Sequence, residues 1–151
     1  MWRKALLFGT AVLFALTAGR AFWVSLGENP FNLSGATYVE YFQQVDRRIA
    51  IPMAVTGLGG TLLAGMAAVA HRRDRNTFAL MLAACVLGVV GSLVTVLINV
   101  PINDQIATWN PAALPTGYEE FLHRWWTWHQ VRLFALGSGM GLVFAGMLAR
   151  K

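Results

Sequence analysis

Three side chains near the start of the last apolar stretch have the types and the spacing for proton and oxyanion chemistry. Trp125, His129 and Arg132 recur at helical spacing, so a helix brings them to one face, with Trp128 four residues before the arginine. A neutral imidazole is a suitable general base, and a guanidinium can hold a developing negative charge on oxygen. Tryptophan also collects at membrane–water boundaries, which accounts for some of these indoles. It does not account for His129 and Arg132, because ionisable residues within an apolar stretch are candidates for a functional site.

Two amides form a second polar group at the end of the preceding apolar stretch. Asn99 and Asn103 flank Pro101 on either side. A proline leaves backbone carbonyls without their helical donors, so polar groups here could face a cavity. The alternative is that an amide in this position only caps the last helical turn.

Three polar residues of the first half could line the same pocket. Arg20 lies about seven residues from the outer end of the first apolar stretch, where a cation is costly unless it snorkels to the headgroups or faces a cavity. Glu40 and Gln44 share one face of a polar segment, 36–48, which is either a solvated surface or a lid over the bundle. We expect all three to contact a bound molecule.

Four long stretches with few or no charges must position these residues. They cover residues 5–27, 50–70, 77–98 and 130–149, in a chain that is 56% hydrophobic and 13% charged. About 20 mainly apolar residues cross a bilayer core, and only helices or closed barrels satisfy the backbone there. We therefore expect an all-α integral membrane four-helix bundle, a single domain over residues 1–151. Two longer outer loops join the helices, the first carrying a surface helix over 36–48, and residues 118–130 run directly into the last span.

The distribution of cations predicts the topology. Seven cations flank one side of the spans and four flank the other: Arg3, Lys4, Arg72, Arg73, Arg75, Arg150 and Lys151 against Arg47, Arg48, Arg124 and Arg132. By the positive-inside rule both termini are cytoplasmic, and we expect the bacterial inner (plasma) membrane. The first stretch also resembles a signal peptide, but its apolar run continues to Trp23, which favours a retained helix.

Several function classes are disfavoured by residues that the sequence lacks. Cys85 is the only cysteine, which excludes disulfide-exchange and vitamin-K-reductase-like chemistry. The cations gather at span ends and leave no basic stripe, so nucleic acid is not a partner. His123 and His129 are six apart and no His-x-x-x-His pair exists, which argues against a closed zinc site, although copper or iron held by His129 and carboxylates stays open.

Small residues repeat every fourth position on two of the spans. The two series are Gly57-Thr61-Gly65 and Gly137-Gly141-Ala145. That spacing lets helix backbones approach closely in lipid, so we expect both series at helix–helix contacts.

The polar motifs together resemble a known family. Asn99-x-Pro101-x-Asn103, a spacer of about 20 residues and Trp125-x-x-x-His129-x-x-Arg132 are similar to the pattern of the anthrone-oxygenase-like proteins, small four-helix membrane proteins long catalogued as a domain of unknown function. The resemblance is specific across about residues 99–132. It implies oxidation of an anthrone to an anthraquinone by dioxygen without a classical cofactor, with Asn99, Asn103, His129 and Arg132 as site residues. Which of Trp125, Trp126 and Trp128 matches the family tryptophan stays open.

The expected function follows from the residues and the resemblance together. We expect a membrane-embedded oxygenase or oxidoreductase acting on a lipophilic aromatic, anthrone-like or quinol-like compound, with dioxygen as co-substrate and no cofactor. His129 is the expected base, Arg132 with the two amides holds the oxyanion, and Trp125 and Trp128 form the walls. The alternative is a non-catalytic membrane protein that binds a lipid or small hydrophobe, or an accessory subunit of a membrane complex. A transporter is disfavoured by the scarcity of buried charge, and a homo-oligomer stays open.

Overall fold

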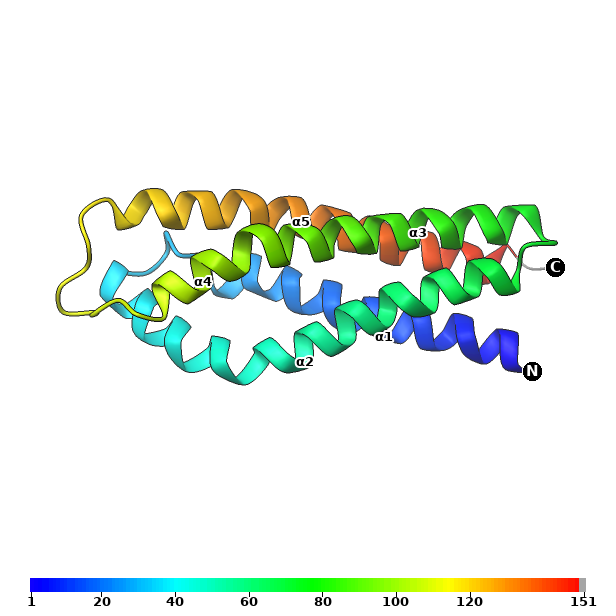
Figure 1. Ribbon diagram of the computed structural model, residues 1–151, viewed down its shortest axis with the longest axis horizontal. Helices are drawn as coiled ribbons and strands as arrows, with labels where there is room; N and C mark the ends of the chain where they lie inside the picture. Colours follow the sequence, from blue (N-terminus) through cyan, green and yellow to red (C-terminus); the bar gives the residue numbers. More distant parts are fainter. Residues whose placement is uncertain (150–151) are drawn as a thin grey trace.

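Each apolar stretch of the sequence forms a helix that is longer than the stretch itself. The structure, a computed structural model, describes residues 1–149 as four long antiparallel helical rods (Figure 1). The elements are α1 (Trp2–Gly27), α2 (Gly35–Ala70), α3 (Arg75–Val94), the π-helical turn η1 (Thr95–Asn99), α4 (Val100–Ile106) and α5 (Tyr118–Leu148). All four rods, the third being α3 to α4, are long and apolar enough to cross a membrane. The expected all-α four-helix architecture is confirmed.

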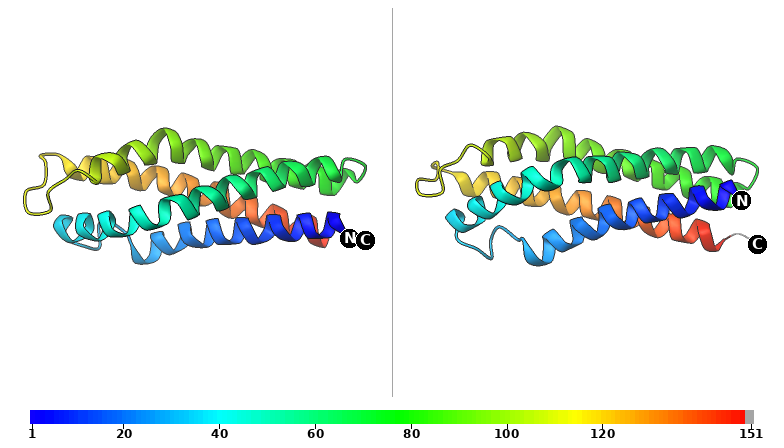
Figure 2. Two further views of the ribbon diagram at one scale, coloured as in Figure 1. Left: turned by 60° about the horizontal axis from the view of Figure 1, so that its bottom comes forward. Right: turned by 90° about the horizontal axis from the view of Figure 1, so that it is seen from below.

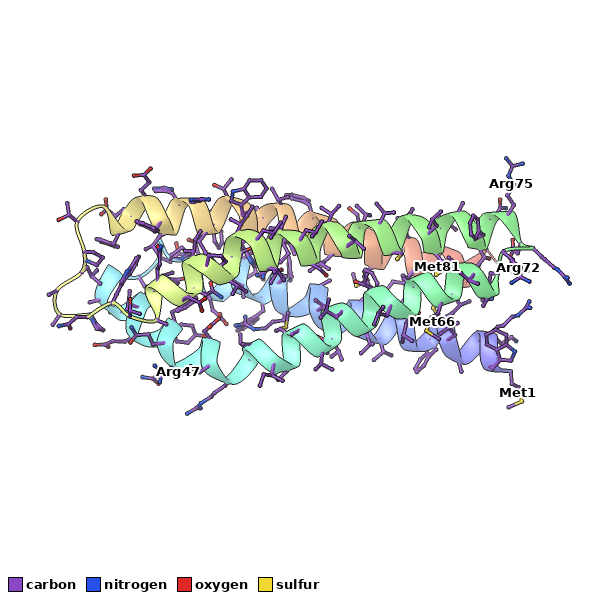
Figure 3. All side chains as sticks on the ribbon, in the orientation of Figure 1. Met1, Arg47, Met66, Arg72, Arg75 and Met81 are labelled. Atoms are coloured by element: carbon purple, nitrogen blue, oxygen red, sulfur yellow. The ribbon has the colours of Figure 1, made fainter. Side chains whose placement is uncertain are left out.

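The start of α1, the end of α5 and the short connection between α2 and α3 lie at one end of the bundle (Figure 2). Arg72 and Arg75 lie at this end, near Met1 (Figure 3). The two longer connections, 28–34 and 107–117, lie at the opposite end (Figure 1). Gly117 precedes α5 with a φ of 79°, a left-handed conformation that favours glycine. That this end faces the cytoplasm stays a prediction from the distribution of charges.

Helix α2 differs from the expected pair of a surface helix and a separate span. Residues 35–70 form one continuous helix with Pro52 in its interior. Pro52 has no N–H to offer the carbonyl four residues before it, and such a loss bends a helix. Accordingly, α2 bows away from its neighbours in its first half and then returns (Figure 1). Residues 118–130 and the last span are one helix, as expected.

The third rod continues past the point where the sequence predicts its end. The Val100 N–H donates to the Thr95 carbonyl five residues back, which defines the π-helical turn, and α4 follows with Pro101 at its start. The missing N–H of Pro101 explains why the regular bonding pattern is interrupted here. Asn99 therefore lies inside a continuous rod and does not cap its end.

Small residues close the half of the bundle near the chain ends, which we call the packed half. Its core consists of Leu7, Ala11, Phe14, Ala64, Ala67, Ala68, Met81, Ala84 and Val143. A Cβ added at Gly139 would lie 2.6 Å from Phe14 Cε1, and one added at Gly146 would lie 2.6 Å from Met81 Cε. The expected contact stripe on α2 is confirmed, since Thr61 lies against Gly88 and Gly65 against Cys85. The expected stripe on α5 is wrong: Cβ atoms at Gly137 and Gly141 would meet nothing within 4 Å. The glycines of α5 that contact other helices are Gly139 and Gly146.

Larger side chains separate the helices in the other half, which we call the cavity half. Its core consists of Val24, Tyr38, Val39, Phe42, Ile102, Ile106, Leu122 and Trp125. Gln43 fastens α2 to the end of α4, because its Nε2 donates to the carbonyls of Ile106 (3.1 Å) and Trp109 (2.9 Å). Helix α2 is thus held at Gln43 and again at Thr61, and it bows outward between these two points.

Candidate functional site

A cavity of about 240 Å³ lies where α2 bows away from the bundle. It is lined by α1, α2, the α3–η1–α4 rod and α5. This volume lies just below the roughly 300–1,000 Å³ usual for pockets that take drug-sized ligands, so it suits a small molecule.

The lining of the cavity divides into an apolar and a polar part. Ala54, Leu58, Val96 and Val100 line it and are also exposed on the surface of the bundle, so the apolar part is continuous with the surface that would face lipid. The polar part consists of Thr17, Arg20, Glu28, Tyr38, Tyr41, Asp46, Ser92, Thr95, Asn103 and Arg132. The site can therefore take a lipophilic molecule that carries a polar group at one end.

Arg132 and His129 form one hydrogen-bonded unit on α5. Arg132 Nη2 lies 2.8 Å from His129 Nδ1, and Arg132 Nη1 lies 3.4 Å from Thr95 Oγ1. A guanidinium only donates, so Nδ1 must accept and the histidine proton resides on Nε2. That nitrogen lies 3.1 Å from the Ala21 carbonyl and 3.2 Å from Ser25 Oγ on α1. His129 is fully buried and does not line the cavity, so it orients Arg132 from behind.

Arg132 has no ionic partner in the described part of the chain. The ion pair formed within residues 1–149 joins Arg20 Nη2 to Glu28 Oε2 at 2.7 Å. Arg132 Nε and Arg20 Nη1 are both buried without a hydrogen-bond partner among these residues. A cation inside an apolar bundle is costly without a partner. Two guanidinium groups that line one cavity make it suited to an anionic or strongly polar oxygen.

Asn103 links the cavity carboxylate Asp46 to Trp125. Asn103 Nδ2 donates to Asp46 Oδ1 at 3.0 Å, and Asn103 Oδ1 accepts from Trp125 Nε1 at 2.7 Å. The Trp125 ring in turn lies parallel to the His129 ring, with centroids 5.1 Å apart and an interplanar angle of 2°. Asn99 Nδ2 donates to the Trp125 carbonyl at 3.3 Å. A continuous chain of contacts therefore runs from Asp46 on α2 to Arg132 on α5.

The structure brings most of the sequence-predicted site residues together. Arg20, Asn103, Trp125 and Arg132 line the cavity, and Asn99 and His129 support it from behind. Of the three candidate tryptophans, Trp125 bonds to Asn103, and Trp126 stacks on His129 at 5.6 Å.

Three predicted residues lie outside the cavity. Trp128 is exposed on the bundle surface. Glu40 and Gln44 line a separate shallow depression with Gln43, Arg47 and Arg48. Arg47 points away from the bundle (Figure 3), in keeping with a solvated face.

Asp46 lines the cavity but is not among the site residues predicted from the sequence. A usable signal was present, since Val39, Phe42, Asp46 and Ile49 follow the 3-4-3 spacing of one helical face. The spacing places Asp46 on the buried face of the helix, although its position beside Arg47 and Arg48 in the sequence suggests a solvated residue. Within residues 1–149, no three His, Cys, Asp or Glu side chains gather in a way that could hold a metal ion.

Comparison with known proteins identifies a family for this chain. The sequence model of a family described as anthrone oxygenase matches residues 41–142, more than half of the chain. The matched range contains Asp46, Asn99, Asn103, His129 and Arg132, whereas Arg20 and Glu28 precede it. Neither the curated proteins nor the solved structures gave a match.

Proposed function

We propose that this chain, which belongs to the anthrone oxygenase family, is a membrane-embedded oxidoreductase that oxidises a lipophilic aromatic compound with an acidic C–H or O–H group. Dioxygen is the proposed co-substrate. The substrate reaches the cavity from the bilayer, past the exposed apolar residues Ala54, Leu58, Val96 and Val100. An anthrone fits this description, because loss of its methylene proton gives an aromatic enolate.

One observation carries the proposal: Arg132 lines a cavity that is otherwise largely apolar, and within residues 1–149 it has no ionic partner and leaves its buried Nε without a hydrogen-bond partner. A neutral hydrocarbon or an acyl chain would leave this donor unsatisfied, at a cost of about 1–3 kcal/mol. An enolate or phenolate oxygen satisfies it and also neutralises the charge. Because a donor that is already in place stabilises charge as it develops, the same contact favours ionisation of the substrate.

The surrounding residues hold this donor in place. His129 accepts from Arg132 Nη2, and the Ala21 carbonyl and Ser25 keep the proton on the far side of the imidazole. The ionised, electron-rich aromatic then reacts directly with dioxygen in a space that excludes bulk water. Asn103 and Trp125, joined by the bond from the indole N–H to the amide oxygen, complete the polar wall.

The test is oxygen uptake by the detergent-purified protein with a simple anthrone such as dithranol. The wild type should exceed autoxidation, and Arg132→Gln should bind a hydroxyanthraquinone about 10- to 100-fold more weakly and lose most of the uptake, since a charge-assisted hydrogen bond contributes about 1.5–3 kcal/mol. Arg124→Gln is the matched control, because Arg124 is an exposed arginine of the same helix. It should behave as wild type.

Three outcomes would contradict the proposal or change it. Binding of the quinone without oxygen uptake would favour a non-catalytic protein that holds a small hydrophobe. Equal binding by wild type and Arg132→Gln would remove the assigned role of Arg132. Stoichiometric copper, iron or haem found by metal analysis and absorption spectroscopy would keep the site and replace the direct reaction with dioxygen.

A further inference from the structure

We propose that Asp46 is the group that takes the proton from the bound substrate. The inference rests on the proposed function and names a catalytic residue for it. Asp46 lies on α2, faces the cavity opposite α5 and belongs to a helical face that is otherwise apolar. An acidic side chain in such a place is a functional candidate, because it has no role in packing.

The hydrogen bonds of Asp46 leave one oxygen free for the substrate. Asn103 Nδ2 donates to Asp46 Oδ1. The side-chain amide of Asn103 cannot exchange its nitrogen and oxygen by a 180° flip, because Asn103 Oδ1 accepts from Trp125 Nε1. Within residues 1–149, no hydrogen bond or ion pair engages Oδ2. The carboxylate is thus oriented by one oxygen while the other keeps its lone pairs.

The remaining candidate bases of the cavity are already engaged. A proton taken up by Glu28 would neutralise its ion pair with Arg20 (2.7 Å), whereas Asp46 forms no ion pair within residues 1–149. His129 is buried behind Arg132, its Nδ1 lone pair is taken by that arginine, and its Nε2 proton faces Ala21. For His129 to accept a substrate proton, the Arg132 bond would have to open. Asp46 needs no such rearrangement.

The step balances as follows for an anthrone. One C–H bond of the methylene breaks, its proton goes to Asp46 Oδ2, and its electron pair enters the ring system as an enolate whose oxygen is held by Arg132. A C–O bond then forms between dioxygen and the former methylene carbon, and the O–O bond and the second C–H bond of that carbon break. Dioxygen is thereby reduced: one oxygen atom becomes the new carbonyl oxygen, and the other leaves as water with the two methylene hydrogens. The proton on Asp46 is released into that water.

The test follows proton removal separately from oxidation. Exchange of the dithranol methylene with deuterium is measured anaerobically in detergent, with wild type, Asp46→Asn, His129→Asn and, as a matched control, Asp104→Asn. Asp104 is a neighbouring exposed carboxylate. Wild type and Asp104→Asn should accelerate exchange over detergent alone, and Asp46→Asn should lose about 100-fold or more of that acceleration. His129→Asn should lose clearly less of it than Asp46→Asn, because it weakens only the support of Arg132.

Further readouts separate a base from a structural residue. Asparagine has the shape of aspartate and its oxygen can still accept from Asn103, so Asp46→Asn should unfold at the wild-type temperature and bind hydroxyanthraquinone at least as tightly. Wild-type exchange should fall at low pH, whereas the residual exchange of Asp46→Asn should not show that fall, and Asp46→Glu should recover part of the rate.

Two results would overturn the assignment in distinguishable ways. Wild-type exchange in Asp46→Asn, with loss in His129→Asn, would transfer the role to the histidine and leave the proposed function intact. No acceleration by the wild type itself would remove the proposed function together with the role of Asp46.

Discussion

The two halves of the bundle are built from the same four rods, but one half has a filled core and the other surrounds a cavity. In the packed half, glycines let Phe14 and Met81 press against the opposing backbone, and every large side chain of the core is apolar. In the cavity half, aromatic side chains hold the helices apart, α2 bows outward, and charged groups face the space that results. The core of the packed half is therefore filled by side chains, whereas the cavity half keeps a space between its helices.

The difference shows what a buried charge requires. Most polar groups of the packed half are satisfied locally, as when Thr10 and Thr61 donate to the carbonyl four residues back in their own helices. The exception within residues 1–149 is the buried His71, whose Nδ1 lies 2.8 Å from the Ala67 carbonyl while its Nε2 has no partner. In the cavity half, Asn103, His129 and Arg132 find partners on other helices, and two guanidinium donors find none in the described chain. Local satisfaction serves stability, whereas a network that spans helices and ends in free donors serves a ligand.

The largest effect on stability should come from filling a glycine of the packed half. Gly139→Ala places a methyl group 2.6 Å from a carbon of the buried Phe14 ring, so it should lower the free energy of unfolding by about 1–3 kcal/mol. Gly137→Ala, two residues away on the same helix, meets nothing within 4 Å and should be neutral or slightly stabilising. Denaturant titration in detergent measures both. Equal destabilisation by the two variants would mean that the packed half does not depend on this contact.

The same pair of glycines shows how far the sequence could predict the fold. The four spans, their helical nature and the continuous last helix follow from apolar run length, which is a strong signal. The contact face of α5 could not be chosen, because Gly137-Gly141 and Gly139-Gly146 both present small residues at suitable spacing and only the partner helix decides between them. The continuity of α2 was also missed, because Pro52 in a helix interior bends the chain without ending it.

The site was predictable where apolar surroundings made polar residues conspicuous. Asn103, Trp125, His129 and Arg132 stand out on helices of low polarity, and the structure joins them. Asp46 was not predicted, because its charged neighbours in the sequence resemble a solvated segment. Glu40 and Gln44 were predicted to contact a ligand, but they line a depression outside the cavity. Pattern alone also cannot show that His129 lies behind Arg132, since residues three apart on a helix share a face at different depths.

A smaller effect should follow from releasing the bowed part of α2. Gln43→Ala removes the amide that donates to the carbonyls of Ile106 and Trp109, so it should lower the free energy of unfolding by about 1 kcal/mol and speed amide hydrogen exchange around residues 106–110. Gln44→Ala is the matched control, since Gln44 is its exposed neighbour and should change stability by less than about 0.5 kcal/mol. If the two variants are alike, the bow of α2 is set by Pro52 alone.

The smallest effect concerns the N-terminal caps of α2 and α3, which lie at opposite ends of the bundle. Both caps make the same hydrogen bond, one through a hydroxyl and the other through a carboxylate. Ser34 caps α2 and Asp74 caps α3, each accepting from the backbone N–H of a threonine three residues later, Thr37 and Thr77. The Thr77 hydroxyl, which donates to Asp74 Oδ2, lowers the pKa of that carboxyl below its ordinary 3.8, and the Thr77 backbone N–H adds to this.

The sign of the resulting pH dependence follows from linkage. A carboxyl whose pKa is lower in the folded state contributes stability that is full above its unfolded pKa and is lost as the pH falls through the folded value. Asp74→Ser should therefore unfold at a slightly lower temperature than wild type at pH 7, and the difference should shrink between about pH 5 and about pH 2. Ser34→Ala should lower the unfolding temperature by the same amount at pH 7 and at low pH, because a hydroxyl does not titrate in this range. A gap between Asp74→Ser and wild type that stays constant would show that the cap acts through shape alone, and the two ends of the bundle would then be capped alike.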